Sequence, residues 1–321
     1  MVKKLEKIFI ILLISGLTVL LVCSSVNSID FPRKTVKIII TTEAGGGEDS
    51  DGRALAPFLQ KYLGVNVLIE NQTGAGGKIA FEKFQRTKPD GYSIVLYNFP
   101  KSIIIEYMGK VNFRTRDYTP IYAWNRSNQL MVVHADTWKT FNEFLKTAKT
   151  KTLSGGLMGR GSTTHLAGLI AMDEFGIKVN WVPYEGYAGA LAALAGKHID
   201  FVICLSASAT SLIEAGMLRP LLLLGDLRDP YFPDVPIPKD IGFTITAFFP
   251  AIRSAFAPPD TPLAIVKVWE EAFSKAVNEP AYIDWAKKRK IALHLLSAHE
   301  FAKVVLETYS NIEKFQKILK E

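Results

Sequence analysis

Short apolar runs alternate along the chain with segments in which apolar residues recur every three or four positions. This pattern predicts strands followed by helices. Residues 36–40 form an apolar run of strand character. After the glycines at 45–47, apolar residues recur three or four positions apart from Leu55 to Leu63, which is the spacing of one helix face. The polar residues at 49–51 offer N-caps for this helix. Further strands are predicted at 65–70, 92–97, 129–133, 152–155, 178–182, 200–205 and 219–224, with helical segments between most of them.

Repeated alternation of strands and helices predicts an α/β fold with mainly parallel sheets flanked by helices. From 226 to 259 the prolines at 230, 233, 236, 238, 250, 258 and 259 indicate turns and linker instead. Helices then dominate, with at most one short strand at 291–295, and we expect them to pack on the first domain. The chain would cross between two domains near 125 and near 250, which predicts a hinge and a cleft. The expected domains are 29–125 plus 250–321, and 126–249.

The first 28 residues have the three parts of an export signal. Lys3, Lys4 and Lys7 precede an uncharged, mostly apolar stretch of 16 residues, 8–23, and small residues follow up to Ser28. The stretch is shorter than the roughly 18–20 residues that comfortably span a bilayer, so cleavage is favoured over an uncleaved anchor. A lipid anchor at Cys23 is a weaker alternative, because Val22 stands where such signals require a small residue.

Composition and charge narrow the classes of function. The chain has 321 residues, of which 48% are hydrophobic and 21% charged, as in a folded protein of two ordinary domains. The net charge of +7 is spread along the chain without basic clusters interleaved with aromatics, so no nucleic-acid partner is expected. Ile79 interrupts both nucleotide-binding glycine patterns, and the histidines lack metal-ligand spacing. We therefore expect no cofactor and no metal.

Two glycine-rich loops that lead into helices are candidate anion sites. Residues 41–49 and 159–165 would each present free backbone N–H groups at a helix start, although tight turns need glycine for the same dihedral angles. Ser162 or Thr163 can cap the second helix, which puts His165 in its first turn. Ser162 and His165 are not a good nucleophile–base pair, because no nucleophile elbow surrounds the serine. Arg160 adds a cation to the second loop.

The order of these motifs resembles the substrate-binding proteins of tripartite tricarboxylate transporters, also called the Bug family. The matching segments in chain order are Asp30-Phe31-Pro32, 39–49, 53–57, 70–77, Pro89-Asp90-Gly91-Tyr92, 159–162 with 165–167, 182–186, 196–200, 215–220, 232–236 and 257–262. The resemblance runs from about residue 30 to the C-terminus. Because many motifs occur in family order, it is far more specific than one glycine loop.

The resemblance implies a two-domain periplasmic binding protein of the Venus-flytrap type. It would capture a small carboxylate in the interdomain cleft, deliver it to the permease subunits of a membrane transporter, act as a monomer and catalyse no reaction. An enzyme on the same two-domain frame that acts on a small organic acid is the alternative. The effector domain of a transcription regulator is disfavoured by the export signal and by the lack of a DNA-binding domain. The sequence does not name the ligand, because the family recognises it largely through backbone N–H groups and water.

The family's ligand loops carry over onto particular positions of this chain. The matching residues are Thr42, Ala44, Gly45, Gly46, Asp49, Gly159, Gly161, Ser162, Thr163 and His165, with Asn98, Tyr184 and Ser206 as candidates by position. Glu43 and Glu48 depart from the family pattern and would oppose an anion if they pointed inward. Arg160 would offset them or bind a second carboxylate.

The export signal makes a prediction about the mature protein. Cleavage after Ser28 should leave a mature, periplasmic protein that begins at Ile29 when the chain is produced in a host that exports it. Intact-mass measurement tests this. A mass that retains residues 1–28 would contradict cleavage, and an added diacylglycerol on Cys23 would establish the lipoprotein alternative.

Overall fold

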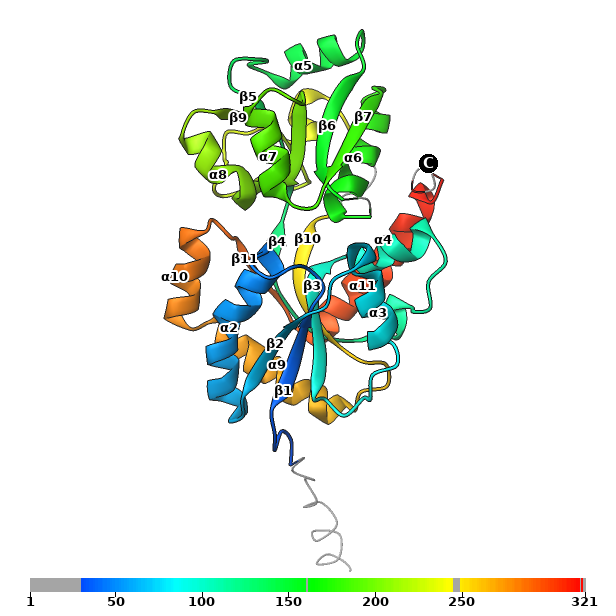
Figure 1. Ribbon diagram of the computed structural model, residues 1–321, viewed down its shortest axis with the longest axis vertical. Helices are drawn as coiled ribbons and strands as arrows, with labels where there is room; N and C mark the ends of the chain where they lie inside the picture. The colour runs from blue at the N-terminus through cyan, green and yellow to red at the C-terminus, as the bar shows by residue number, and fades with distance from the viewer. Residues whose placement is uncertain (1–29, 160, 245–248, 318, 320–321) are drawn as a thin grey trace, which may run out of the picture. The chain divides into compact units, whose positions relative to one another are not determined.

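Two β-sheets, each flanked by helices, organise the chain (Figure 1). The computed structural model describes residues 30–159, 161–244, 249–317 and 319, and residues 32–321 belong to one structural unit. The strand order is β11-β4-β10-β3-β1-β2 in the six-stranded sheet and β7-β6-β8-β5-β9 in the five-stranded sheet. The strands are β1 (Val36–Ile40), β2 (Val67–Asn71), β3 (Ser93–Phe99), β4 (Thr119–Ser127), β5 (Gln129–His134), β6 (Leu153–Met158), β7 (Val179–Tyr184), β8 (Phe201–Leu205), β9 (Leu218–Leu224), β10 (Ala251–Ala257) and β11 (Leu293–Leu296).

Most of the connections between strands are helical, as the sequence predicts. The helices are α2 (Gly47–Leu63), α3 (Lys78–Phe84), α4 (Lys101–Met108), α5 (Phe141–Ala148), α6 (Thr163–Glu174), α7 (Tyr187–Ala195), α8 (Ser206–Glu214), α9 (Leu263–Val277), α10 (Pro280–Lys288) and α11 (Ala298–Ile312). Short 3-10 turns are η1 (Ala75–Gly77), η2 (Thr115–Asp117), η3 (Pro238–Ile241) and η4 (Glu313–Phe315). No helix within the described ranges combines the length and the apolar character needed to cross a bilayer. The predicted signal at 1–28 lies outside those ranges.

The α/β fold is confirmed, but the prediction of mainly parallel sheets is wrong, because both sheets are mixed. Four of the nine strand pairings are parallel and five are antiparallel. The antiparallel pairings arise where the chain passes between the sheets, because β4 leads directly into β5 and β9 is followed by β10 in the other sheet. We call the elements packed on each sheet the six-stranded lobe and the five-stranded lobe. The domain limits at 125/126 and 249/250 stay a prediction.

The interpretation of residues 226–259 as turns and linker is wrong for 251–257. This segment is β10, which lies between β3 and β4 and has all seven of its residues buried. A strand buried on both faces shows no alternation, and alanine and serine have little strand preference, so the proline-rich context dominated the prediction. The helix start also differs, because α2 begins at Gly47 and residues 49–51 lie inside it rather than at its N-cap.

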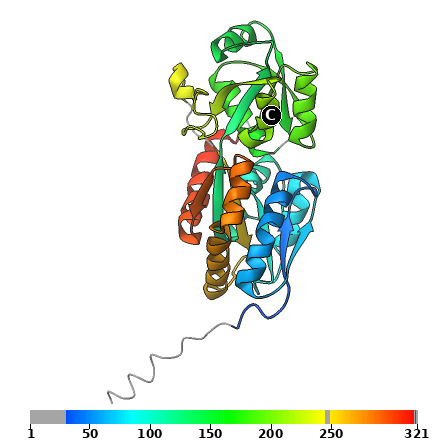
Figure 2. The same cartoon turned by 90° about the vertical axis from the view of Figure 1, so that its left-hand side faces the viewer.

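Helices cover both faces of the six-stranded sheet. On one face α2, α9 and α10 contact one another, as Figure 2 shows in blue, gold and orange. There Phe273 of α9 stacks on Trp124 of β4 with ring centroids 5.2 Å apart. The opposite face packs against α3, α4 and α11, where Phe81 and Phe301 contact the aromatic rings of β3 and β10. The carboxyl ends of β1 and β3 are thereby held in fixed positions.

Two adjacent glycines in β6 allow close packing at the centre of the five-stranded lobe. A β-carbon added to Gly155 would lie 2.6 Å from the ring of Phe201 and 2.8 Å from Trp181. One added to Gly156 would lie 2.6 Å from Ile199. Both faces of β6 are therefore filled by neighbouring side chains, and no larger residue fits there without displacement.

The substitution Gly155→Ala should lower the free energy of unfolding by about 1–3 kcal/mol, because overpacking forces the two aromatic side chains to move. Gly109→Ala is the matched control. Gly109 has an extended φ of −175° and no atom within 4 Å of an added β-carbon, so its effect should stay within about 0.5 kcal/mol. Chemical denaturation measures both variants. Equal effects would contradict the packing argument.

Candidate functional site

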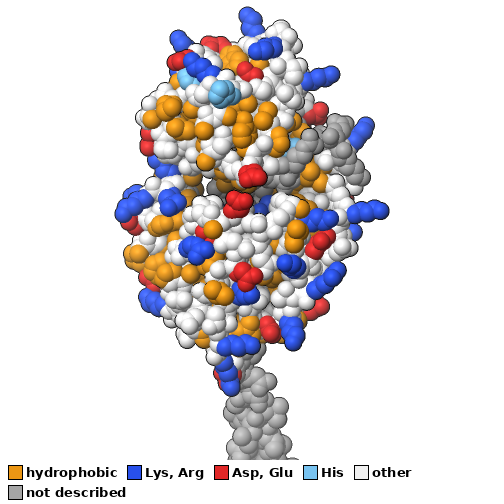
Figure 3. Space-filling view, in the orientation of Figure 1, with side chains coloured by type: hydrophobic (Ala, Val, Ile, Leu, Met, Phe, Trp, Pro, Cys, Tyr) orange, Lys and Arg blue, Asp and Glu red, His pale blue; other side chains and the backbone are white. Residues whose placement is uncertain are grey.

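A cavity of about 620 Å³ lies where the carboxyl ends of strands from both sheets meet. The six-stranded lobe contributes the residues after β1, the ends of β3 and β4, part of β10, and Lys288 at the end of α10 with Arg289 and Ile291 after it. The five-stranded lobe contributes Met158 at the end of β6, the start of α7 and one side of α8 from Ala207 to Glu214. Ligands of open α/β sheets bind in this position, outside the carboxyl ends of the strands. Figure 3 shows acidic side chains beside the hollow between the lobes, on a face where basic and acidic groups are otherwise interspersed.

The loop between β1 and α2 forms one wall of the cavity. Gly45 has a φ of +81°, a conformation that favours glycine. The carboxylate of Asp49 accepts hydrogen bonds from the Gly45 N–H at 2.8 Å, from Arg53 and from Asn71. Burial raises the pKa of Asp49, but these donors outweigh it and the net shift is downward. Asp49 therefore holds the loop in shape and does not itself line the cavity.

Glu48 lines the cavity, but its carboxylate is bound by protein groups. It accepts hydrogen bonds from the Thr41 hydroxyl and the Asn98 N–H, both at 3.1 Å, and lies 3.4 Å from the ammonium of Lys101. Burial opposes its charge, but Lys101 and Arg253 together with the two hydrogen bonds lower its pKa below the usual value. We expected Glu48 to oppose a bound anion. This expectation is weakened, because Lys101 and Arg253 already compensate the negative charge of Glu48. Glu43 is exposed at the edge of the cavity.

A second buried ion pair, which the sequence did not indicate, lies beside the first. Arg253 of β10 donates from Nε to Asp51 Oδ2 at 2.9 Å, and its backbone N–H donates to the Asn125 side chain. The other carboxylate oxygen of Asp51 accepts from the Tyr282 hydroxyl at 2.7 Å and from the Trp124 indole at 3.3 Å. Arg253 lines the cavity, yet its Nη1 is buried without a hydrogen-bond partner among the described residues.

Two further polar groups from cavity-lining residues are buried without a partner in the described part of the chain. They are the hydroxyl of Thr42, in the loop after β1, and that of Tyr187, at the start of α7. Thr164 lies near the Tyr187 hydroxyl without forming a hydrogen bond of normal geometry. Buried polar groups usually have partners, so three exceptions around one cavity point to a polar ligand or water there.

The predicted loop at 159–165 lies beside the cavity rather than along its lining. Ser162 caps α6 by accepting from the His165 N–H at 3.1 Å, and His165 Nδ1 accepts from the Gly161 N–H at 3.2 Å. A β-carbon on Gly161 would lie 3.0 Å from the sulfur of Met108, so this loop contacts α4 of the other lobe. The cap prediction for Ser162 is confirmed.

The predicted ligand residues thus divide into two groups. The cavity is lined by Thr42, Ala44, Gly46 and Asn98. The residues that are not among its lining are Gly45, Asp49, Gly159, Gly161, Ser162, Thr163, His165, Tyr184 and Ser206. Arg160 lies outside the described residues. Ligand contact by each of these residues stays a prediction.

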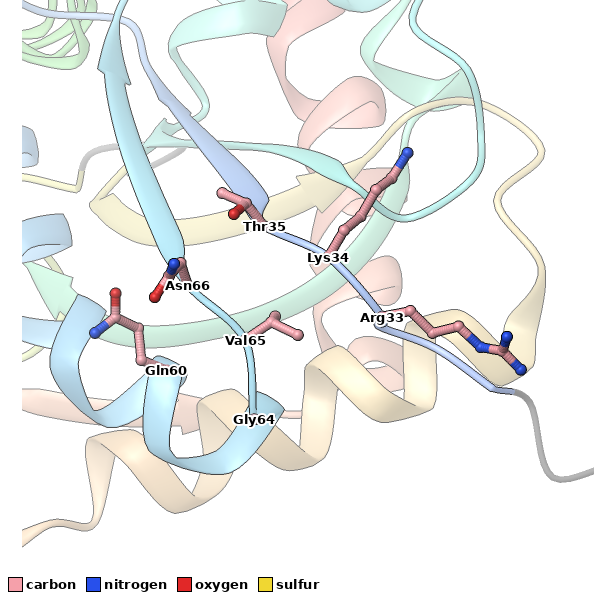
Figure 4. Close-up of a pocket in the computed structure, with 7 residues that line it drawn as sticks. All are labelled: Arg33, Lys34, Thr35, Gln60, Gly64, Val65 and Asn66. Atoms are coloured by element: carbon pink, nitrogen blue, oxygen red, sulfur yellow. The ribbon is translucent and has the colours of Figure 1, made fainter.

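A second hollow lies at the opposite end of β1 and has a different character (Figure 4). Arg33, Lys34 and Thr35 line it from one side, and Gln60 and Asn66 from the other. Figure 4 shows Arg33 and Lys34 extending away from the two amides, and the Lys34 ammonium lies over the Tyr92 ring at 4.5 Å. Because its polar groups diverge and it lies at the amino end of the strand, we do not assign it to ligand binding.

Within the described ranges, no group of three or more His, Cys, Asp or Glu side chains is arranged to hold a metal ion. Burial raises the pKa of the Cys204 thiol to about 12, so this cysteine is a buried apolar side chain rather than a nucleophile. The arrangement is suited to binding a small polar molecule.

Comparison with known proteins connects this geometry to one family. Residues 52–321 match the family described as the tripartite tricarboxylate transporter family receptor. A UPF0065 protein from the gbd 5' region of Cupriavidus necator is 31% identical over 282 residues, which cover 87% of this chain and 85% of the relative.

Solved structures share the fold. A TctC solute binding protein from Polaromonas has 28% identity and a TM-score of 0.74, covering 90% of this chain and 99% of the other. MatC from Rhodopseudomonas palustris, solved with bound malate, has 23% identity and a TM-score of 0.78, covering 90% of this chain and 100% of the other.

The Glu48 contacts predict how stability depends on pH. At pH 7, Glu48→Gln should lower the free energy of unfolding by about 3–5 kcal/mol, because Lys101 is left buried without its partner. The folded-state pKa of Glu48 lies below its ordinary value of 4.5. Its contribution is therefore present above pH 4.5 and is lost as the pH falls through the folded-state pKa.

Chemical denaturation at pH 7 and at pH values below 4.5 measures this. The deficit of the Gln variant should shrink on acidification, while the exposed control Glu43→Gln should show no deficit at either pH. A deficit that does not change with pH would contradict the assignment of the charge to Glu48.

Proposed function

Because the chain belongs to the tripartite tricarboxylate transporter receptor family, we propose that it is an extracytoplasmic solute-binding protein that captures a small carboxylate in the cavity between its lobes. It would then deliver this ligand to the permease subunits of a membrane transporter. The observation that carries the proposal is the cavity itself, which is lined from both lobes at the carboxyl ends of their strands.

The ligand class is supported by the chemistry of the six-stranded lobe. The loop after β1 leads into a helix of 17 residues whose N-terminus faces the cavity. The first N–H groups of a helix have no intrahelical acceptors and favour an anion. The similar protein MatC binds malate, a small dicarboxylate, in its solved structure. A carboxylate at this helix start therefore agrees with both observations.

The connections between the lobes support a hinged mechanism. The chain passes once from β4 to β5 and returns before β10, so two segments join the lobes. We propose that these segments are the hinge between domains 29–125 plus 250–321 and 126–249. A ligand that contacts both lobes would stabilise the closed arrangement by its higher affinity for it.

The alternative of an enzyme on the same frame has less support. Ser162 and His165 are near each other, but the imidazole Nδ1 accepts from a backbone N–H and the serine hydroxyl donates to the Gly159 carbonyl. The serine proton is thus not directed to the imidazole, which a nucleophile–base pair requires. The proposal is therefore binding without chemical conversion.

Native mass spectrometry of freshly purified protein, followed by titration with malate, succinate and adipate, tests the proposal. At least one acid should bind one per chain and be recovered unchanged. At 100 times its dissociation constant it should stabilise the fold by about 2.7 kcal/mol. If no small acid co-purifies and none of the three binds, carboxylate capture is contradicted. Recovery of a converted product would favour the enzyme.

A further inference from the structure

We propose that Arg253 directly binds the carboxylate of the ligand, together with the first N–H groups of α2, and so makes the cavity selective for carboxylates over neutral isosteres. This inference rests on the proposed function, which leaves open the groups that contact the ligand. It assigns a side chain to a recognition task that backbone groups alone would otherwise perform.

The first observation is the unused hydrogen-bonding capacity of a buried cation. The side chain of Arg253 is only 6% exposed, and its Nε is bound to Asp51. Its Nη1 has no hydrogen-bond partner among the described residues. A buried donor on a charged group is costly to leave unpaired, and the described part of the chain offers no acceptor for it. Nη1 itself is buried, but Arg253 lines the adjoining cavity, so a small movement of its side chain on binding would bring a carboxylate oxygen to this donor.

The second observation is that the guanidinium lies beside the start of α2. A β-carbon placed on Gly47, the first residue of the helix, would lie 3.6 Å from Arg253 Nη2. One placed on Gly46 would lie 3.6 Å from the unpaired hydroxyl of Thr42. The absence of a side chain at Gly47 leaves room beside the guanidinium, whereas a β-carbon on Gly46 would also lie 3.1 Å from the carbonyl oxygen of Glu43. The cation and the hydroxyl therefore lie beside two successive residues at the helix start, and a cation, a free hydroxyl and a helix N-terminus each favour an anion.

The two buried carboxylates near Arg253, Glu48 and Asp51, do not supply an acceptor for its Nη1. Glu48 is held by Thr41, Asn98 and Lys101. Asp51 accepts from Tyr282 and Trp124 in addition to Arg253 Nε. Both carboxylates thus compensate the neighbouring cations, and their oxygens accept hydrogen bonds from these other groups. Neither carboxylate accepts a hydrogen bond from Arg253 Nη1.

A purely structural role for Arg253 explains only part of this geometry. The contact with Asp51 uses Nε alone, which leaves the forked end of the guanidinium directed at groups other than Asp51. A planar fork of two N–H groups matches a carboxylate in a bidentate arrangement, which an amide of the same shape does not match. Arg253 would therefore discriminate between an acid and the corresponding amide, which a structural role would not produce.

Variants that keep the buried charges balanced test the inference. Asp51→Asn with Arg253→Gln removes both charges together, so that neither remains buried alone. Arg253→Lys keeps the charge beside Asp51 but loses the fork, and covers the case in which the double variant does not fold. Arg116→Gln removes the same charge from an exposed arginine that stacks on Tyr309 in the same lobe and is absent from the cavity lining.

The probes are malate, succinate and adipate, each compared with its diamide by titration calorimetry. The double variant should bind the preferred acid about 10- to 150-fold more weakly, the effect typical of a charge-assisted contact. Its affinity for the diamide should change much less, so that the preference for acid collapses. Arg253→Lys should weaken acid binding about tenfold through loss of the bidentate contact. Arg116→Gln should stay within about threefold, because exposed charges are screened.

The outcomes separate this inference from the proposed function. If wild type binds an acid and both Arg253 variants keep its full preference over the amide, Arg253 is not the carboxylate group and only this inference falls. If affinity for acid and diamide falls equally, the role of Arg253 is structural and the inference is again overturned. If wild type binds none of the three acids, the proposed function fails and the inference fails with it.

Discussion

The ion pair between Asp51 and Arg253 joins the first helix of the six-stranded lobe to the strand on which the chain returns from the five-stranded lobe. Its residues are 202 positions apart. The same carboxylate holds Trp124 of β4 and Tyr282 of α10, so four elements meet at one buried group. A buried ion pair adds little net stability compared with apolar side chains of the same volume. Its main effect is to fix orientation, since the helix start and the guanidinium are held against the cavity together.

Most of the fold was predictable because its strands and helices carry local signals. The apolar run at 36–40 became β1, and Leu55, Leu59 and Leu63 of the predicted stripe lie on the buried face of α2. β10 was not predictable in this way. Its sequence has no alternation, its alanines and serine favour no strand, and its place between β3 and β4 depends on partners more than 120 residues away. Tertiary pairing, rather than local preference, makes this segment a strand.

The candidate site was predictable only where a local motif formed it. The glycine loop after β1 does line the cavity, because glycines before a helix give a free helix start whatever the rest of the chain does. In the five-stranded lobe the sequence pointed to the start of α6, whereas the cavity is lined by the start of α7 and by α8 along its length. Strands β6, β7 and β8 each lead toward a helix start at the same sheet edge, and only their packing decides which starts face the other lobe.

The charges beneath the cavity are balanced in pairs, Glu48 with Lys101 and Asp51 with Arg253. Without the two acids, the cations would attract an anion more strongly, but the empty protein would carry two unpaired buried charges, each costing several kcal/mol. With them, an anion in the cavity would be stabilised by unused donors and by the partial positive charge of about +0.5 at the helix start. In this arrangement directed hydrogen bonds, rather than the paired charges, would bind the anion. This moderates affinity and preserves the folded state without ligand, both of which a receptor needs if it must release what it captures.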